Sequence, residues 1–324
     1  MKRVPLSLLV DDPSPVLSVY YTHHKTGKTD DGRDVIKYFP NSFLEEFCSV
    51  VKEYGIKGKF SVVPCPGNCG DIVNGIEGVS DEDLKYWLCT VKKHVVPNFS
   101  IGPEMLTHNK AVDLETGKAL DMREVEWSNT QDRTTLTPYI TKALAILKEA
   151  GFECSGVTSP WSFGINVEGE YTAAISKAVY DVYGKKNAWY FLRGLRDTPN
   201  AKPWVALEED GRILVSVPAT TRDKMWQTIH TADTSKEYIN RVADELITSD
   251  GKDGEIIRVL ETGGYPILVT HWQSLASNGL FTGVKVLHEV AKRINDNLYD
   301  RVEWMTAEEI MELVINNKED YPNR

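Results

Sequence analysis

The sequence predicts an α/β protein folded as a (β/α) barrel. Short apolar runs recur along the 324 residues, and most of them are separated by stretches with helical periodicity. Roughly seven or eight strands alternate with helices in this way, which favours a barrel over an open sheet. Because no linker, repeat or low-complexity stretch divides the chain, we expect a single domain over residues 1–324.

The first predicted strand covers residues 6–12 and ends in the pair Asp11 and Asp12. Pro13 ends the strand, because proline cannot continue a β-ladder. Two adjacent carboxylates at the end of a buried strand are not packing residues. They suit either a catalytic pocket or an ordinary surface turn, and this stretch alone does not decide between the two.

The next elements continue the alternation. Residues 41–54 place apolar side chains on one face of a helix, and the strand 59–63 follows two glycines. Ser80 to Asp83 resemble a capping box, which begins a helix through His94. The third strand then covers 99–105.

The second half of the chain repeats the pattern. A helix over 134–150 has its apolar residues on one face and ends at Gly151. Further strands are expected at 152–158, 188–192, 212–217, 266–272 and 302–304. Further helices are expected at 167–182, 235–248, 254–262, 283–296 and 306–316.

The composition excludes several classes of protein. The net charge is -10 and no dense Lys/Arg run is present, so we expect no nucleic-acid partner. No apolar stretch approaches the ~20 residues of a membrane span, and no signal peptide is visible. We therefore expect a cytoplasmic protein without a membrane partner. The oligomeric state is not predicted.

The five cysteines do not suggest a disulfide framework, because their number is odd and their spacing is scattered. Cys65 and Cys69 lie close together in a Gly/Pro loop, where a small disulfide or half of a zinc site is the alternative to free thiols. We expect free thiols.

Four predicted strands end in residues that catalysis commonly uses. Active sites of (β/α) barrels lie at the carboxyl ends of the strands, so we expect these side chains to meet. A lone histidine or tryptophan in such a place is often a loop or packing residue, but four coincidences favour a site. The residues are Asp11, Asp12, His108, Trp161, His271 and Trp272.

These residue types fit one mechanism. Asp and His are ligands for zinc or another divalent transition metal. A metal held by three protein groups leaves a position for water and polarises a carbonyl. A neighbouring carboxylate can take the proton of the attacking water, and a histidine opposite can protonate the leaving group. The pattern therefore predicts hydrolysis of an ester or amide.

The same segments resemble motifs of the polysaccharide deacetylase family (carbohydrate esterase family 4). Leu-Leu-Val-Asp11-Asp12-Pro resembles T-F-D-D-G, and Glu104-Met-Leu-Thr-His108-Asn resembles E-[IM]-x-x-H-[ST]. Ser159-Pro160-Trp161 resembles R-x-P-[WYF], and Leu268-Val-Thr-His271 resembles L-x-x-H. Lys59-Phe-Ser-Val-Val63 resembles the family's second strand.

The resemblance covers nearly the whole chain in order. It implies a distorted (β/α)7-type barrel that removes N- or O-acetyl groups from carbohydrates. It implies that Asp11 is the general base and Asp12 a metal ligand. His108 would be a second ligand, His271 the catalytic acid and Trp161 a wall of the substrate pocket.

One departure concerns the metal ligands. The family has a second histidine four residues after the first, and here Val112 stands in that position. The nearest substitute is Asp113, so the predicted ligands are Asp12, His108 and Asp113. This set still suits a divalent metal, with zinc expected, but the site is harder and more anionic.

Two further departures lie beside the catalytic aspartate. The arginine that braces this aspartate in the family is replaced by Thr158, and the glycine after the acidic pair is Pro13. Arg193 and Arg222 lie near other strand ends and are candidates to supply the missing charge.

We expect a carbohydrate pocket lined by Tyr21, His24, Trp161 and Trp272. The polar loops at 22–40, 113–133 and 222–234, with Trp127 and Trp226, are candidates to shape it. Two alternatives stay open: a metal-free glycoside hydrolase that uses paired carboxylates such as Asp11 and Glu104, and an inactive barrel that binds sugar.

Overall fold

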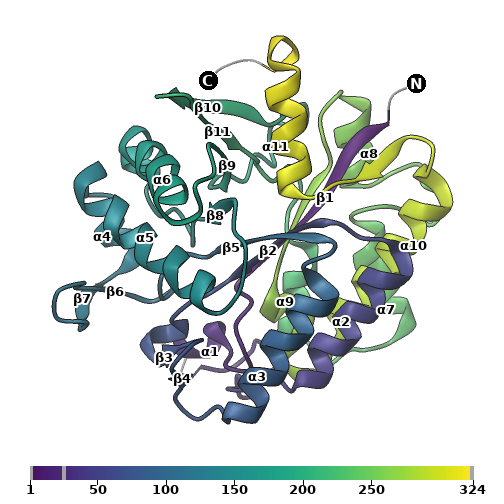
Figure 1. Cartoon of the computed structure of the whole chain (residues 1–324). Helices are drawn as coiled ribbons and strands as arrows, with labels where there is room; N and C mark the ends of the chain where they lie inside the picture. The colour runs from purple at the N-terminus through teal and green to yellow at the C-terminus, as the bar shows by residue number, and fades with distance from the viewer. Residues whose placement is uncertain (1–2, 24–26, 322–324) are drawn as a thin grey trace.

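Two largely parallel β-sheets form the centre of the computed structural model, which describes residues 3–23 and 27–321 (Figure 1). The first sheet has the order β12-β1-β2-β5, and β13 also pairs with β1. The pairs of this sheet are all parallel. Its strands are β1 (Val4–Asp11), β2 (Gly58–Val62), β5 (Phe99–Pro103), β12 (Ile267–His271) and β13 (Val302–Trp304).

The second sheet has the order β10-β11-β9-β8. Only β10 and β11 pair antiparallel within it. Its strands are β8 (Gly156–Thr158), β9 (Asn187–Phe191), β10 (Trp204–Glu209) and β11 (Arg212–Ser216). Two short antiparallel ribbons lie outside the sheets: β3 (Gly70–Asp71) with β4 (Gly75–Ile76), and β6 (Lys110–Val112) with β7 (Ala119–Arg123).

The two sheets are joined at their edges by isolated contacts. Single parallel bridges link Ile101 to Cys154 and Glu104 to Thr158, between β5 and β8. On the other side, the Thr220 N–H donates to the Ile267 carbonyl at 2.9 Å. The described strands therefore form a mixed α/β arrangement with parallel sheets, and no continuous ladder closes them into the predicted barrel. β8 forms its ladder with β9 and meets the β5 side only through these single bridges.

Helices surround the sheets (Figure 1). In this view α2, α3, α7 and α10 lie at the lower right, α4, α5 and α6 at the left, and α11 at the top. The helices are α1 (Val19–His23), α2 (Asn41–Tyr54), α3 (Asp81–Thr90), α4 (Glu124–Ser128), α5 (Arg133–Glu149), α6 (Glu168–Tyr183), α7 (Lys236–Asp244), α8 (Glu255–Glu261), α9 (Trp272–Ala276), α10 (Thr282–Leu298) and α11 (Ala307–Asn316).

The alternation predicted from the sequence is confirmed element by element, with boundaries shifted by a few residues. The largest shifts are four residues: strand β8 was expected to begin at residue 152 and begins at Gly156, and the helix expected to end at residue 248 ends at Asp244. The short helices α1, α4 and α9, strand β10 and the two ribbons were not predicted. The single domain expected over residues 1–324 stays a prediction.

Strand β1 is almost entirely buried. Seven of its eight residues are buried, with β12 on one edge and β2 pairing with it as well. β2 approaches β1 so closely that a Cβ at Gly58 would lie 1.8 Å from the Leu8 carbonyl oxygen. Glycine is therefore required there, and the buried β1 ends where the acidic pair begins.

Trp272 belongs to this core rather than to a pocket. It is 1% exposed, and its ring lies 4.3 Å from Phe43, 5.4 Å from Phe47 and 5.4 Å from Phe60 between centroids. The prediction that Trp272 binds substrate is wrong, because the chain turns into helix α9 directly after His271 and carries the indole inward.

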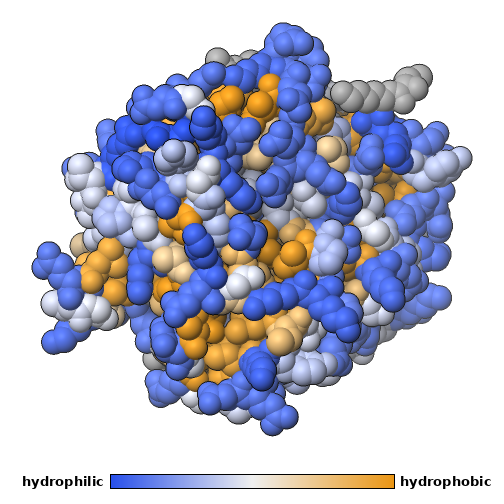
Figure 2. All heavy atoms as spheres, viewed as in Figure 1, coloured by the Kyte–Doolittle hydropathy of each residue, from blue (hydrophilic) through white to orange (hydrophobic). Residues whose placement is uncertain are grey.

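One face of the molecule is mostly polar, and the cysteines are not paired. Figure 2 shows a face that is largely hydrophilic, with apolar side chains gathered in patches. All five cysteines are free thiols, as expected. Among the described residues, no helix has the length and apolar character needed to cross a membrane.

Candidate active site

The carboxyl ends of the parallel strands surround a cavity of about 480 Å³. The register of β1 against β12 pairs Asp11 directly with His271, so these two residues meet across neighbouring strands. Five residues predicted from strand ends line this cavity: Asp11, Asp12, His108, Trp161 and His271.

Asp12, Glu104 and His108 form a buried group at one side of the cavity. Each offers a ligand atom, and these atoms lie within 4.8 Å of one another. His108 Nε2 is 2.7 Å from Asp12 Oδ1 and 3.5 Å from Glu104 Oε1. Two carboxylates and one imidazole are a ligand set for a divalent transition metal.

Neighbouring groups orient the two carboxylates. Glu104 Oε2 accepts from the Asp12 N–H at 2.6 Å and from Ser61 Oγ at 2.7 Å. Asp12 Oδ2 accepts from the Gln273 side-chain amide. Asp12 Oδ1 and His108 Nδ1 are buried without a hydrogen bond of acceptable geometry. A buried carboxylate oxygen that lacks a well-formed hydrogen bond is costly in a folded protein, and a bound cation would satisfy it.

The electrostatics of the group favour a positive charge at its centre. Burial disfavours the charged form of His108, but the charges of Asp12 and Glu104 outweigh this effect and raise its pKa well above the usual value. For Asp12, burial is likewise outweighed by the charge of His108, and its pKa is lowered. Without a metal, Asp12 and Glu104 favour a proton on His108. With a metal, the same two carboxylates and the neutral imidazole would bind the ion together.

Three residues around the cavity have left-handed backbone conformations. The φ angles are 67° for Asp12, 52° for His108 and 50° for Trp161. Non-glycine residues adopt this region rarely, and such conformations persist where the surrounding structure holds them, often at functional sites. Asp12 directly follows β1, and all three side chains line the cavity.

Asp11 is held by a buried lysine on the neighbouring strand. Lys59 of β2 is 0% exposed, and its ammonium group donates to Asp11 Oδ1 and to Ser61 Oγ. Burial raises the pKa of Asp11, the charge of Lys59 opposes this effect, and the result is a pKa raised to about 6.

The cation beside Asp11 is therefore neither of the predicted arginines. Arg193 pairs with Glu168, and Arg222 pairs with Asp197. The cation beside Asp11 is Lys59, which belongs to the strand predicted at 59–63.

His271 faces the same cavity from β12 and pairs with Asp223. His271 Nδ1 lies 2.8 Å from Asp223 Oδ2, and the same oxygen accepts from Ser274 Oγ at 2.6 Å. Burial lowers the pKa of His271, but the hydrogen bond to Asp223 and the nearby carboxylates outweigh it and raise the pKa to about 9. The imidazole is therefore protonated near neutral pH.

Aromatic rings form the walls of the cavity. Trp161 is 45% exposed, and its ring lies 4.4 Å from His108 and 4.9 Å from His23 between centroids. On the other side, Trp226 contacts both His271 at 5.1 Å and Tyr20 at 5.7 Å. An exposed indole beside polar groups is a surface on which a sugar ring can stack.

Besides Trp272, two predicted site residues, Asp113 and Tyr21, do not line the cavity. Asp113 lies in a turn of the β6–β7 ribbon, where its carboxylate accepts from the Glu115 and Thr116 N–H groups at 2.9 Å. Those bonds hold the predicted ligand away from Asp12 and His108, and Glu104 completes the group instead. Tyr21 does not line the cavity and lies beside Lys37, and His24 lies outside the described residues.

The residues that sequence reasoning missed had weak signals. Tyr20 and His23 are three apart on one face of α1, so the helical period selects them rather than Tyr21. Glu104 is part of the quoted motif, but the motif predicts the third ligand four residues after His108. In the structure the third ligand candidate lies four residues before it. Asp223 begins a short 3-10 helix (Lys224–His230) in a polar loop and carried no local signal.

No model of a protein family matches the sequence, and neither does any curated protein. Among solved structures, the fold is similar to that of a polysaccharide deacetylase.

One similar structure is a proposed polysaccharide deacetylase from Mycobacterium smegmatis, with a TM-score of 0.53 and 14% identity over 87% of this chain and 79% of that one. A family 4 acetyl xylan esterase from Clostridium thermocellum, solved with a cobalt ion, has a TM-score of 0.42 and 11% identity over 98% and 93%. A peptidoglycan deacetylase from Bacillus subtilis has a TM-score of 0.45 and 11% identity over 98% and 95%.

Proposed function

We propose that this chain is a metal-dependent hydrolase that removes an acetyl group from a carbohydrate. The observation that carries the proposal is the buried group Asp12, Glu104 and His108, which lies in one cavity with Asp11 and His271. A metal site, a base and an acid around one cavity are the parts that acyl hydrolysis needs. The similarity of the fold to polysaccharide deacetylases supports the carbohydrate substrate.

A simple charge count supports a divalent metal. The positive charge of Lys59 balances Asp11. Asp12 and Glu104 together bring two further negative charges into a buried place, and a divalent cation would balance both. Asp12, Glu104 and His108 would hold the ion, with zinc as our first choice of metal. When bound, the metal supplies a Lewis acid that polarises the acyl carbonyl.

In the proposed reaction, Asp11 takes a proton from the attacking water. Lys59 holds this carboxylate in place and favours its ionised form. The water oxygen bonds to the acyl carbon, and the bond from that carbon to the sugar nitrogen or oxygen breaks. His271 gives its proton to the departing atom, and Asp223 orients the imidazole for this transfer. Trp161 offers the sugar ring a wall beside the metal group.

The glycoside hydrolase alternative requires Asp11 and Glu104 as a free acid–base pair. Glu104 is 2% exposed, and its carboxylate receives the Asp12 N–H and Ser61 Oγ and lies against His108. A carboxylate with these contacts suits a ligand better than a proton donor to a glycosidic oxygen.

The test is acetate release from acetylated amino sugars by purified, metal-loaded protein. We expect Asp11→Asn and His271→Ala each to lower the rate by about 100- to 10,000-fold. Glu104→Gln should lose the bound metal, whereas Asp113→Asn should retain both metal and activity. Wild-type protein that binds no divalent ion, even after reconstitution, would refute the proposal and leave the two metal-free alternatives, the glycoside hydrolase and the inactive sugar-binding barrel.

A further inference from the structure

We propose that Glu124 is a positioning residue that fixes the backbone at His108 for metal binding. This inference rests on the function proposed above. Glu124 is the first residue of α4, and it is 0% exposed although it carries a carboxylate. A buried carboxylate without a salt-bridge partner needs several hydrogen bonds.

Those hydrogen bonds go to the loop that carries His108. Glu124 Oε1 accepts from the Leu106 N–H at 3.1 Å and from the Thr107 N–H at 2.9 Å. Glu124 Oε2 accepts from the His108 N–H at 2.8 Å. Tyr139 adds a fourth donor, with its hydroxyl 2.6 Å from Oε1. Three consecutive backbone N–H groups therefore converge on one side chain.

The loop needs such a support because its backbone is unfavourable. Met105 has φ 38° and His108 has φ 52°, and both are in the region that favours glycine. These two residues bracket the segment that Glu124 binds. The reversal brings Glu104 and His108, which are four residues apart, to the same side, where both join the metal group.

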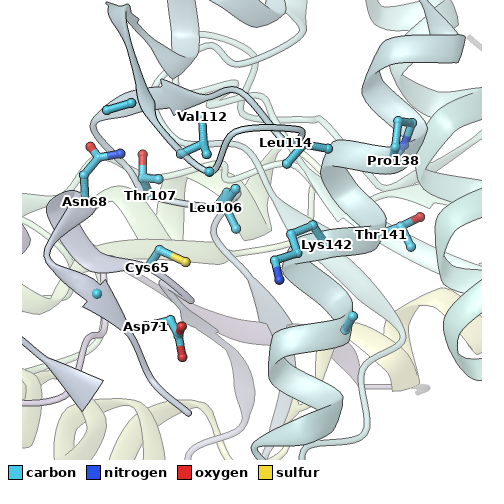
Figure 3. Close-up of a pocket in the computed structure, with 14 residues that line it drawn as sticks. Cys65, Asn68, Asp71, Leu106, Thr107, Val112, Leu114, Pro138, Thr141 and Lys142 are labelled. Atoms are coloured by element: carbon cyan, nitrogen blue, oxygen red, sulfur yellow. The ribbon is translucent and has the colours of Figure 1, made fainter. Parts of the chain in front are cut away.

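The far side of the loop borders a cavity. Leu106 and Thr107 line a second cavity of about 690 Å³ between the β6–β7 ribbon and α5. Figure 3 shows both side chains at this cavity, with Val112 above and Lys142 across it. On this side the Leu106 and Thr107 carbonyls accept from the Cys65 and Gly67 N–H groups at 2.8 and 2.9 Å. The N–H groups of the loop at Leu106, Thr107 and His108 are bound by Glu124, which is therefore the anchor on the other side.

A backbone hydrogen bond also joins the start of α4 to the loop that carries His108. After His108 it runs through the β6–β7 ribbon and returns, and the Glu124 N–H donates to the Asn109 carbonyl at 2.8 Å. The ribbon that was expected to be a plain polar loop thus delivers the anchoring carboxylate to the metal loop.

The test variant is Glu124→Gln. The amide oxygen of glutamine can still accept from Leu106, Thr107 and Tyr139, but its NH₂ group then faces the His108 N–H, and the bond at that residue is lost. We expect Zn²⁺ and Co²⁺ to bind about 10- to 100-fold more weakly, as is typical when a group that orients a ligand is removed. Titration calorimetry measures the affinity, and the absorption of bound Co²⁺ should change because the imidazole moves.

Glu168→Gln is the matched control. Glu168 is a carboxylate that receives the Tyr190 hydroxyl at 2.9 Å and pairs with Arg193, away from the metal loop. This variant should bind Co²⁺ as the wild type does. Tyr139→Phe removes the fourth donor but none of the loop bonds, so it should lower thermal stability without weakening metal binding.

The outcomes separate the two proposals. A wild-type protein that binds no metal overturns the proposed function. A wild-type protein that binds metal, with an unchanged affinity and Co²⁺ spectrum in Glu124→Gln, overturns the role of Glu124 alone. If Glu124→Gln does not fold, Glu124→Asp replaces it. This variant keeps the charge but is too short to reach all three N–H groups, so unchanged affinity there also overturns the inference.

Discussion

Replacing Lys59 by methionine removes the charge beside Asp11 but keeps most of the side-chain volume. The pKa of Asp11, already raised to about 6, should then rise further, because burial acts without its main opposing charge. Asp11 must be ionised to act as a base, so the acidic limb of the pH–rate profile should move to higher pH and the rate at pH 7 should fall. The profile of Lys59→Met against wild type measures this shift.

The same substitution should lower stability. Leaving one partner of a buried ion pair alone costs about 3–5 kcal/mol of unfolding free energy, measurable by urea denaturation. Lys57→Met is the matched control, because Lys57 pairs with Glu309 at the partly exposed surface and should cost at most about 1 kcal/mol. Equal losses in the two variants would contradict the role assigned to Lys59.

Asp223→Asn should change the alkaline limb of the pH–rate profile. His271 acts as an acid only while protonated, and its raised pKa of about 9 keeps it protonated until the pH rises through that value. Without the Asp223 carboxylate, the pKa should fall toward the ordinary histidine value near 6.5, and the alkaline limb should move to lower pH. An unmoved alkaline limb would mean that another group supplies the proton.

Single residues were predictable where a strand end marked them. Asp11, Asp12, His108, Trp161 and His271 follow apolar strands, and the structure brings all five to one cavity. Asp113 was chosen by spacing in a loop, and spacing says nothing about a backbone that reverses at Met105 and His108. Lys59 and Asp223 act through contacts with distant parts of the chain, which no local pattern contains.

At the scale of elements, helix α9 directs the indole of Trp272 into the hydrophobic core. Trp272→Ala would leave a cavity among Phe43, Phe47 and Phe60, and we expect a loss of about 3–5 kcal/mol in unfolding free energy. Trp161→Ala removes a half-exposed ring of the same size and should cost much less. Thermal or urea unfolding of the two variants tests the contrast, and a larger loss for Trp161→Ala would contradict it.

Long helices and buried strands were predictable because their apolar periodicity is strong. The β6–β7 ribbon was not, since most of its residues are exposed and its two strands have three and five residues. Helices α1, α4 and α9 have five residues each, too few to show a helical period. These short pieces nonetheless carry Tyr20, His23 and Glu124 to the site.

For the whole molecule, a bound metal should stabilise the fold. At a free Zn²⁺ concentration 100 times the dissociation constant, the expected gain is about 2.7 kcal/mol, seen as a higher Tm that a chelator reverses. Asp12→Asn and His108→Ala should show little or no Zn²⁺-dependent shift. Shifts as large as that of the wild type would indicate that the ion binds elsewhere.

The overall architecture was predictable as parallel α/β, but its closure was not. Counting apolar runs identifies strands, whereas closing a ring depends on how long each ladder is and how the edges align. Here β8 has three residues, and β5 meets its side through single bridges.

The position of β1 has a consequence for how the protein is made. Its partners β12 and β13 lie at the other end of the chain, and Asp12 contacts Gln273 across a separation of 261 residues. At about 5–20 residues per second, a ribosome needs on the order of tens of seconds to supply them. Through that interval the apolar strand has an unpaired edge, a template for aggregation that chaperones would have to shield. Asp11 and His271 can meet only after residue 271 has been made, so products truncated before His271 should have no activity.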